Sequence, residues 1–196
     1  MPRVQADDYD VKIRSILDAA ANLFAQSGYP GTKMQDIAKA CGASKSMLYH
    51  YFPTKDDLLF MMLKEHLETA ISVADENDSS AQTPEVRFAG FVDRWIQKSG
   101  QARRRNLIAM NDVKYLPVAM QQSIKALEKS VIDSVSRYLS HLNPNLPNNL
   151  YTPYTLLLLG MLNYTDVWYK PGGPMKSQEF VDRISRLFLN GFLAEK

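Results

Sequence analysis

Apolar residues recur every three or four positions through most of the chain, which is the spacing of an amphipathic α-helix. The first such stretch contains Ile13, Leu17, Ala20 and Phe24, and it ends before Gly28, which can close a helix in a left-handed conformation. No stretch of alternating polar and apolar residues is long enough for a strand. The sequence therefore predicts an all-α protein. We expect the later helices over residues 33–41, 44–52, 55–75, 85–100, 104–114, 118–141, 149–169 and 176–193.

Short polar side chains mark the starts of the three helices that follow the first one. Thr32 is a candidate N-cap with Gln35 at the capping-box position, and Ser44 is the next candidate. Thr54 is the third, with Asp57 at the same three-residue spacing. The first two of these helices are short and are joined by a glycine-containing turn. This arrangement is typical of a helix-turn-helix, and we place the motif at about residues 33–52.

The second helix of such a motif lies in the major groove of DNA, where its first residues meet base edges. Leu48 and Phe52 are four residues apart and should face the core, whereas Lys45, Ser46 and Tyr49 should face outward. Lysine and serine side chains can donate hydrogen bonds to bases or to phosphates. The sequence therefore predicts a protein that binds double-stranded DNA.

The charge of this segment supports the same interpretation, although the net charge of the chain is only +2. Between Gly28 and Lys55 there are four lysines and a single acidic residue. A local positive strip suits docking onto a phosphate backbone. On charge alone, however, an ordinary solvated lysine face explains the strip equally well, and both interpretations stay open here.

Two segments, Gly28–Ala38 (GYPGTKMQDIA) and Gly42–Leu58 (GASKSMLYHYFPTKDDL), strongly resemble the TetR family of transcriptional regulators. The resemblance covers about residues 10–60, and Lys33 departs from it where the family often has a threonine. It implies a DNA-binding domain over residues 1–54 and an effector-binding, dimerising domain over residues 55–196. The candidate DNA contacts are Thr32, Lys33, Gln35, Ser44, Lys45, Ser46, Met47, Tyr49, His50, Tyr51 and Lys55.

The resemblance also implies how such a protein works. The expected function is a repressor that leaves its operator when a small-molecule effector binds, with a ligand-dependent activator as the alternative. The expected assembly is a homodimer formed by the last two helices. For two DNA contacts, Tyr49 and Tyr51, packing into the small three-helix core remains the competing interpretation.

Methionine and aromatic side chains in the later helices suit an adaptable apolar pocket with a few polar groups. Plain core packing is the alternative for any one of them. Residues 160–174 (GMLNYTDVWYKPGGP) resemble the corresponding segment of TetR regulators that sense acyl-CoA thioesters, which suggests that ligand class. The candidate ligand contacts are Met62, His66, Phe88, Phe91, Trp95, Arg103, Arg104, Met110, Asn163, Tyr164 and Trp168.

Other classes of protein find little support. The sequence contains no G-x-S-x-G, H-E-x-x-H or G-x-G-x-x-G motif, so a helical enzyme is the weaker alternative. Cys41 is the single cysteine, and no Cys/His cluster has zinc spacing, so we expect neither a metal nor a cofactor. Neither a signal peptide nor a membrane span is recognisable, and we expect a cytoplasmic protein without a membrane partner.

Overall fold

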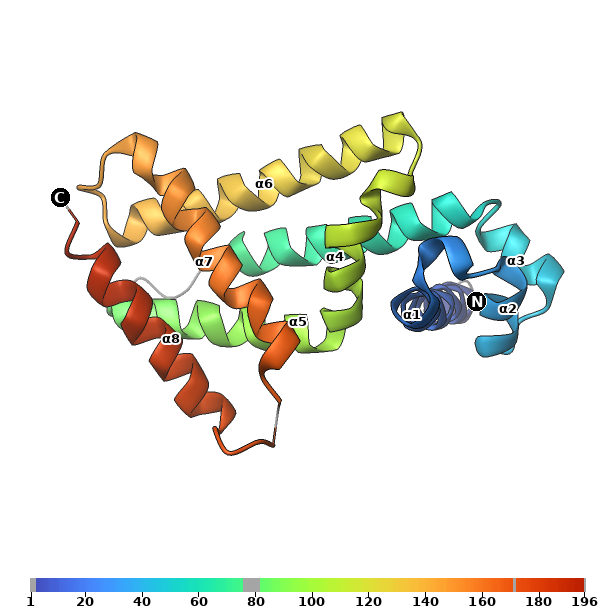
Figure 1. Ribbon diagram of the computed structural model, residues 1–196, viewed down its shortest axis with the longest axis horizontal. Coiled ribbons are helices and arrows are strands. Elements are labelled where there is room, and N and C mark those ends of the chain that lie inside the picture. Colours follow the sequence, from blue (N-terminus) through green and yellow to red (C-terminus); the bar gives the residue numbers. More distant parts are fainter. Residues whose placement is uncertain (1–2, 76–81, 171, 196) are drawn as a thin grey trace. The chain divides into compact units, whose positions relative to one another are not determined.

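A computed structural model describes residues 3–75, 82–170 and 172–195. Within these ranges the chain forms α-helices and one short 3-10 turn, without a strand, which confirms the all-α prediction. Figure 1 labels the helices in chain order. The elements are α1 (Arg3–Gly31), α2 (Met34–Ala40), α3 (Lys45–Tyr51), α4 (Lys55–Asp75), α5 (Pro84–Asp112), η1 (Val113–Tyr115), α6 (Val118–Leu142), α7 (Asn148–Trp168) and α8 (Ser177–Phe192).

The chain divides into two compact units, and three helices contribute to both of them. Unit 1 contains Met1–His66 and Arg104–Lys125, and unit 2 contains Leu67–Arg103 and Ala126–Lys196. Each of α4, α5 and α6 therefore starts in one unit and ends in the other without interruption.

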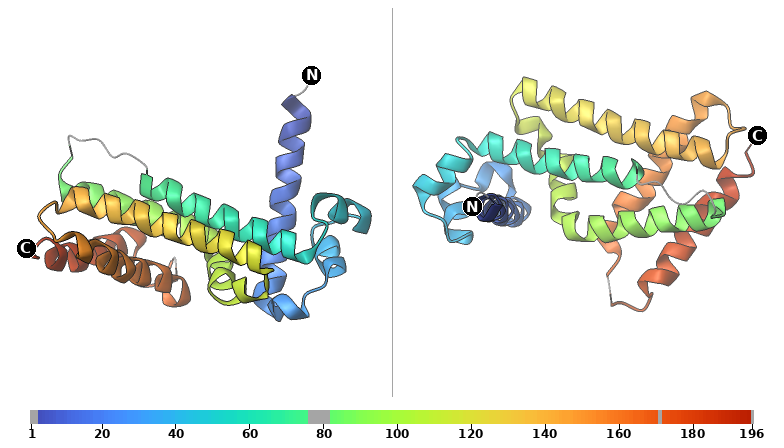
Figure 2. Two further views of the ribbon diagram at one scale, coloured as in Figure 1. Left: turned by 90° about the horizontal axis from the view of Figure 1, so that it is seen from above. Right: turned by 180° about the vertical axis from the view of Figure 1, so that it is seen from behind.

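The core of unit 1 forms where α1 packs with the helices that follow it. Figure 2 shows α1 as a long helix beside the much shorter α2 and α3. Near its C-terminal end α1 is kinked at Gly28, whose φ of 71° and ψ of 159° are not helical. Leu17 and Phe24 of α1, Ile37 of α2, Leu48 of α3 and Leu58 of α4 are all buried. These residues come from the apolar faces that the helical spacing predicts, because each helix must bury one face against its neighbours.

The start of α4 is fixed by a reciprocal capping box. The Asp57 backbone N–H donates to Thr54 Oγ1 at 3.0 Å, and the Thr54 N–H donates to Asp57 Oδ2, also at 3.0 Å. Each side chain thereby pairs a backbone donor that the first turn of a helix leaves without an intrahelical partner. The N-cap predicted at Thr54 is confirmed.

One predicted helix boundary is wrong. We expected a break between residues 100 and 104, but α5 runs continuously from Pro84 to Asp112. A single glycine in a helix interior costs only about 1 kcal/mol, and arginines and leucine in the following turns favour a helix. Gly100 therefore does not interrupt the helix, and the two expected helices are one.

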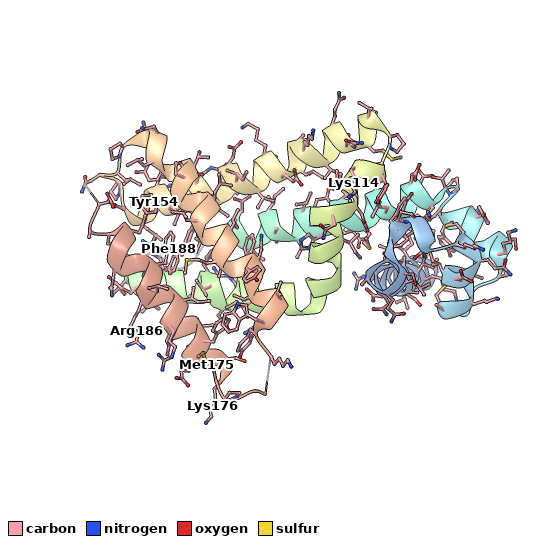
Figure 3. All side chains as sticks on the ribbon, in the orientation of Figure 1. Lys114, Tyr154, Met175, Lys176, Arg186 and Phe188 are labelled. Carbon is pink, nitrogen blue, oxygen red and sulfur yellow. The ribbon has the colours of Figure 1, made fainter. Side chains whose placement is uncertain are left out.

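Unit 2 has an aromatic core and a polar anchor for the end of the chain. Tyr154 of α7 lies against Phe188 of α8, with the ring centroids 6.3 Å apart (Figure 3). Buried Asn143 donates from Nδ2 to the Phe192 carbonyl at 2.8 Å, while the Tyr151 hydroxyl donates to the Asn143 carbonyl. Among the described residues, no helix is both long and apolar enough to cross a membrane.

Candidate functional site

The turn between α2 and α3 has a geometry that only glycine adopts without strain. Gly42 has a φ of 66°, its N–H donates to the Lys39 carbonyl, and the Ala43 N–H donates to the Ala38 carbonyl. This pair of hydrogen bonds is the Schellman motif, which satisfies the last carbonyls of a helix. Two residues later, Ser44 Oγ accepts from the Met47 N–H at 3.1 Å, so the N-cap predicted there is confirmed.

Helix α3 is amphipathic, with one face anchored in unit 1 and the other exposed. Leu48 is 0% exposed, and Phe52, the C-cap of α3, is also buried, as predicted. Lys45, Ser46 and Tyr49 are exposed on the helix surface. The Lys45 ammonium lies 5.9 Å from the centroid of the Tyr49 ring. The exposed face thus combines a cation, a small hydroxyl group and a phenol on one rigid element.

The other candidates near α3 fall into two groups. Lys33 and Gln35 are exposed at the start of α2, and Met47 and His50 are exposed on α3. Tyr51 is half-buried instead, because its ring packs at 5.1 Å from Tyr9 of α1 and at 5.6 Å from His50. The structure therefore gives Tyr51 a packing partner inside unit 1.

Thr32 does not have the local role that we predicted. The N-cap of α2 is Lys33, and no side chain caps this helix. Thr32 is 4% exposed, and its hydroxyl donates to the Gly28 carbonyl at 2.9 Å and to the Leu23 carbonyl at 3.2 Å. The threonine is used to close the end of α1, because the break at Gly28 leaves those carbonyls available.

Lys55, a candidate phosphate contact, has hydrogen-bond partners within unit 1. It is half-buried, and its Nζ donates to the Tyr29 carbonyl at 2.8 Å and to the Thr32 carbonyl at 2.9 Å. The same ammonium lies 4.2 Å from the centroid of the Tyr29 ring, a cation–π contact. We therefore regard Lys55 as a residue that positions the end of α1.

A second cluster of candidates lies in unit 2. Phe88, Phe91 and Trp95 follow one face of α5 and are buried, with 5.6 Å between the rings of Phe91 and Trp95. Trp95 Nε1 donates to Asn163 Oδ1 of α7 at 3.2 Å. Tyr138 of α6 stacks on Phe91 at 4.9 Å. An apolar cluster with a tryptophan–asparagine pair has the composition of a small-molecule site, and equally that of a core.

The remaining ligand candidates are not all part of this cluster. Tyr164 and Trp168 are exposed on α7, at 64% and 53%. Met62 and His66 belong to unit 1, where Met62 is buried and His66 is half-buried. Three candidate side chains lie outside the described part of the structure: Arg103, Arg104 and Met110.

Three residues that the sequence did not single out, Tyr29, Asp56 and Tyr115, join different segments of unit 1. The Tyr29 hydroxyl donates to Asp56, and its ring stacks on Tyr115 of η1 at 5.6 Å. Burial raises the pKa of Tyr29, and the hydrogen bond to Asp56 raises it further, so the phenol stays protonated and donates. The available signal was an aromatic residue directly after the helix-ending Gly28. Its two partners are too distant in sequence to be predicted.

The exposed surface of α2 and α3 presents lysine, serine, glutamine and tyrosine side chains on two helices. Such side chains can donate hydrogen bonds to the phosphates of a polyanion and to polar groups on the edges of its bases. Among the described residues, no group of three His, Cys, Asp or Glu side chains is arranged to hold a metal ion.

Comparison with known proteins gives consistent matches over most of the chain. Residues 16–62 match the family model "Bacterial regulatory proteins, tetR family", and residues 81–192 match "Tetracyclin repressor-like, C-terminal domain". The repressor KstR2 of Mycobacterium tuberculosis is 23% identical over 92% of both chains.

Two solved structures are similar to the chain over most of its length. A TetR-family regulator from Bordetella parapertussis is 31% identical, with a TM-score of 0.80 over 92% of this chain and 95% of that one. AibR, solved in complex with isovaleryl coenzyme A and operator DNA, is 24% identical, with a TM-score of 0.72 over 90% of this chain and 97% of its own.

Proposed function

This chain belongs to the TetR family of bacterial regulatory proteins, and on that premise we propose that it is a transcriptional repressor released from operator DNA by a small-molecule effector. One observation carries the DNA-binding part of the proposal. Leu48 and Phe52 fix α3 in unit 1, while Lys45, Ser46 and Tyr49 stay exposed on it. A helix held in this way can enter the major groove without rearrangement of the motif.

The exposed candidates divide by chemistry into base contacts and phosphate contacts. Lys45, Ser46 and Met47 occupy the first turn of α3, the part of a recognition helix that meets base edges. The side chains that suit phosphate oxygens are those of Lys33, Gln35, Tyr49 and His50. Ser44 caps α3 and is also placed to contact a phosphate. Thr32, Tyr51 and Lys55 support the motif from within unit 1.

We propose that the effector binds among the aromatic residues of unit 2, and that it is an acyl-CoA thioester. An acyl chain suits the apolar surface of Phe88, Phe91 and Trp95, and the amide of Asn163 is placed to orient a polar group near the Trp95 indole. The structure of AibR was solved with isovaleryl coenzyme A, and its fold is shared by this chain. This similarity motivates the choice of ligand class.

The assembly that we propose is a homodimer formed by α7 and α8. Apolar side chains on α7 remain exposed at helical spacing, among them Leu157, Tyr164 and Val167, and Leu187 of α8 is 72% exposed. Gly160 lies in the same stripe of α7 with open space beside it, so a partner helix can approach closely. Exposed apolar surface of this kind marks an interface, and a two-fold dimer supplies two reading helices.

The DNA-binding proposal is tested by titrating the protein against the DNA that flanks its own gene, at several salt concentrations. Lys45→Ala should weaken binding and lower the slope of log affinity against log salt by about one, if it contacts a phosphate, or alter sequence preference, if it contacts a base. Lys125→Ala, an exposed lysine of α6, is the matched control and should change neither. If both variants bind like the wild type, α3 is not the reading helix.

The effector proposal is tested in the same titration with a panel of acyl-CoA thioesters and with free coenzyme A. Release of the DNA by one thioester, but not by free coenzyme A, would support both the ligand class and the repressor mechanism. A ligand releases DNA only if it binds the free state more tightly than the DNA-bound state, and coupling of about 1–3 kcal/mol is typical. Binding that no thioester changes would overturn the acyl-CoA assignment and leave the DNA-binding proposal intact.

A further inference from the structure

Three segments of unit 1 meet at Tyr29, which is 5% exposed. Its ring stacks on Tyr115 of η1, with the planes at 21° and the centroids 5.6 Å apart. Its hydroxyl donates to Asp56, and its carbonyl accepts from Lys55 Nζ. We call Tyr29, Lys55, Asp56 and Tyr115 the Tyr29 junction.

The junction holds the corner between α1 and α2 at two points. Lys55 Nζ donates to the carbonyls of Tyr29 and Thr32, on either side of the turn that leads into α2. The Thr32 hydroxyl in turn donates to the Gly28 and Leu23 carbonyls. Because α2 begins directly after this corner, the position of the helix-turn-helix depends on where these groups are held.

The other side of the junction is the turn that connects α5 with α6. Leu116, directly after η1, is buried, and its carbonyl accepts from Gln121 Nε2 of α6 at 2.7 Å. Tyr115 is itself 43% exposed, and Lys114 Nζ lies 5.2 Å from the centroid of its ring. The stack on Tyr29 therefore joins the α5–α6 turn to the α1–α2 corner through a partly exposed side chain.

Both helices that meet at η1 continue without a break into unit 2. Rigid secondary-structure elements are among the structures that can carry coupling between distant sites. A change in α5 or α6 that reaches the η1 turn also reaches Tyr115, whose ring contacts Tyr29 at the α1–α2 corner.

We propose that Tyr29 and Tyr115 are positioning residues, and that their stack sets the orientation of α2 and α3 with respect to the α5–α6 turn. Neither residue needs to touch DNA. Lys55 and Asp56 hold Tyr29 in the geometry that Tyr115 contacts. The inference deepens the proposed function, because it names the contact through which the state of α5 and α6 would alter operator binding.

A distance measurement within unit 1 tests this without any ligand or DNA. Spin labels are attached at Ala40→Cys on α2 and Gln122→Cys on α6, both exposed, with Cys41→Ser in every variant. Labelled protein is mixed with excess unlabelled protein, so that only distances within one chain contribute. The parent protein should give one narrow distance distribution by double electron–electron resonance.

Removal of the stack should broaden or shift that distribution. We expect this for Tyr115→Ala, whereas Tyr115→Phe keeps the ring and should match the parent. Val118→Ala is the matched control, because Val118 is 70% exposed and lies three residues away. Circular dichroism and thermal unfolding verify that each variant is folded, and Tyr115→Leu replaces Tyr115→Ala if the latter is not. An unchanged distribution in the folded stack-deleting variant overturns the proposal.

Operator affinity provides the second readout. It separates the positioning role of the Tyr29–Tyr115 stack from the proposed DNA-binding function. Tyr115→Ala should lower operator affinity by about fivefold or more, the lower end of typical allosteric coupling, although no base-reading residue is changed. An altered distance distribution with unchanged affinity would overturn the link to operator binding. If the parent protein binds no DNA at all, the proposed function fails, while the distance measurement still decides whether the stack positions α2 and α3.

Discussion

Replacement of Gly42 by alanine should destabilise the protein through backbone conformation alone. Gly42 has a φ of 66° in the Schellman motif between α2 and α3. A Cβ added there would have open space around it, with no heavy atom within 4 Å. Steric conflict with neighbouring side chains therefore contributes nothing, and the cost is that of a left-handed conformation for an L-residue, about 1–2 kcal/mol.

This cost translates into a fall in the midpoint of thermal unfolding of roughly 2–8 °C for a chain of this size. Gly42→Asn should lose less, since asparagine tolerates the left-handed region better than alanine does. Gly191→Ala is the matched control: Gly191 lies in α8 without a positive φ and also has open space beside it. That substitution should stabilise the helix by about 0.5–1 kcal/mol.

The assay is urea and thermal unfolding followed by far-UV circular dichroism, at one protein concentration because the midpoint of a dimer depends on concentration. We expect opposite signs for the two alanine variants and an intermediate stability for Gly42→Asn. A Gly42→Ala variant as stable as the wild type, or a Gly42→Asn variant less stable than Gly42→Ala, would refute a backbone origin of the cost.

Three further predictions follow from burial and charge. Leu48→Ala should lower the free energy of unfolding in urea by about 2–5 kcal/mol and abolish DNA binding, because it leaves a cavity where the buried Leu48 side chain holds α3 in the core. A decrease below about 1 kcal/mol contradicts this. Burial raises the pKa of Asp112, with Lys114 partly opposing the shift, so its ionisation destabilises the fold as the pH rises. Asp112→Asn should therefore raise the unfolding midpoint at pH 7, and this gain should shrink as the pH falls and vanish below about pH 4, the ordinary pKa of an aspartic acid; a gain independent of pH contradicts it. Leu157→Glu should yield monomers in sedimentation, whereas Thr152→Glu, exposed elsewhere on α7, should not; two dimeric variants would refute the α7 interface.

The parts of the fold that the sequence predicted correctly are those with local causes. The cap at Ser44, the capping box of Thr54 and Asp57 and the glycine-containing turn between α2 and α3 each depend on residues within a few positions of one another. The buried face of α3 follows from helical spacing, and Leu48 is buried as expected. Local features of this kind can be predicted from the sequence without knowledge of the tertiary structure.

The predictions that failed depended on competition between local signals and distant contacts. Thr32 has the composition of an N-cap, but its hydroxyl donates to the Leu23 and Gly28 carbonyls at the end of α1. The break expected near Gly100 is overridden by the helix-forming residues on both sides. Tyr29 and Tyr115 are 86 positions apart in the numbering and still form a stack, a pairing that spacing and propensity do not encode.

The ligand candidates show a different limit. Apolar residues at helical spacing predict burial, and Phe88, Phe91 and Trp95 are indeed buried. The same spacing does not separate a pocket from a core, because both require apolar side chains on an inward face. Tyr164 and Trp168 are also aromatic, but they are exposed on α7. There they fit the proposed dimer interface better than a pocket.

Selection of bound sequences from a random duplex library tests the central proposal most directly, because it assumes no target gene and no effector. A dimer with two reading helices should enrich an inverted repeat, with half-site centres about 10 base pairs apart or a multiple of that distance. Enrichment should be lost with a Lys45, Ser46 and Tyr49 triple-alanine variant that remains folded. No enriched sequence with the wild-type protein, or the same enriched sequence with the triple variant, would contradict a repressor that reads DNA through α3.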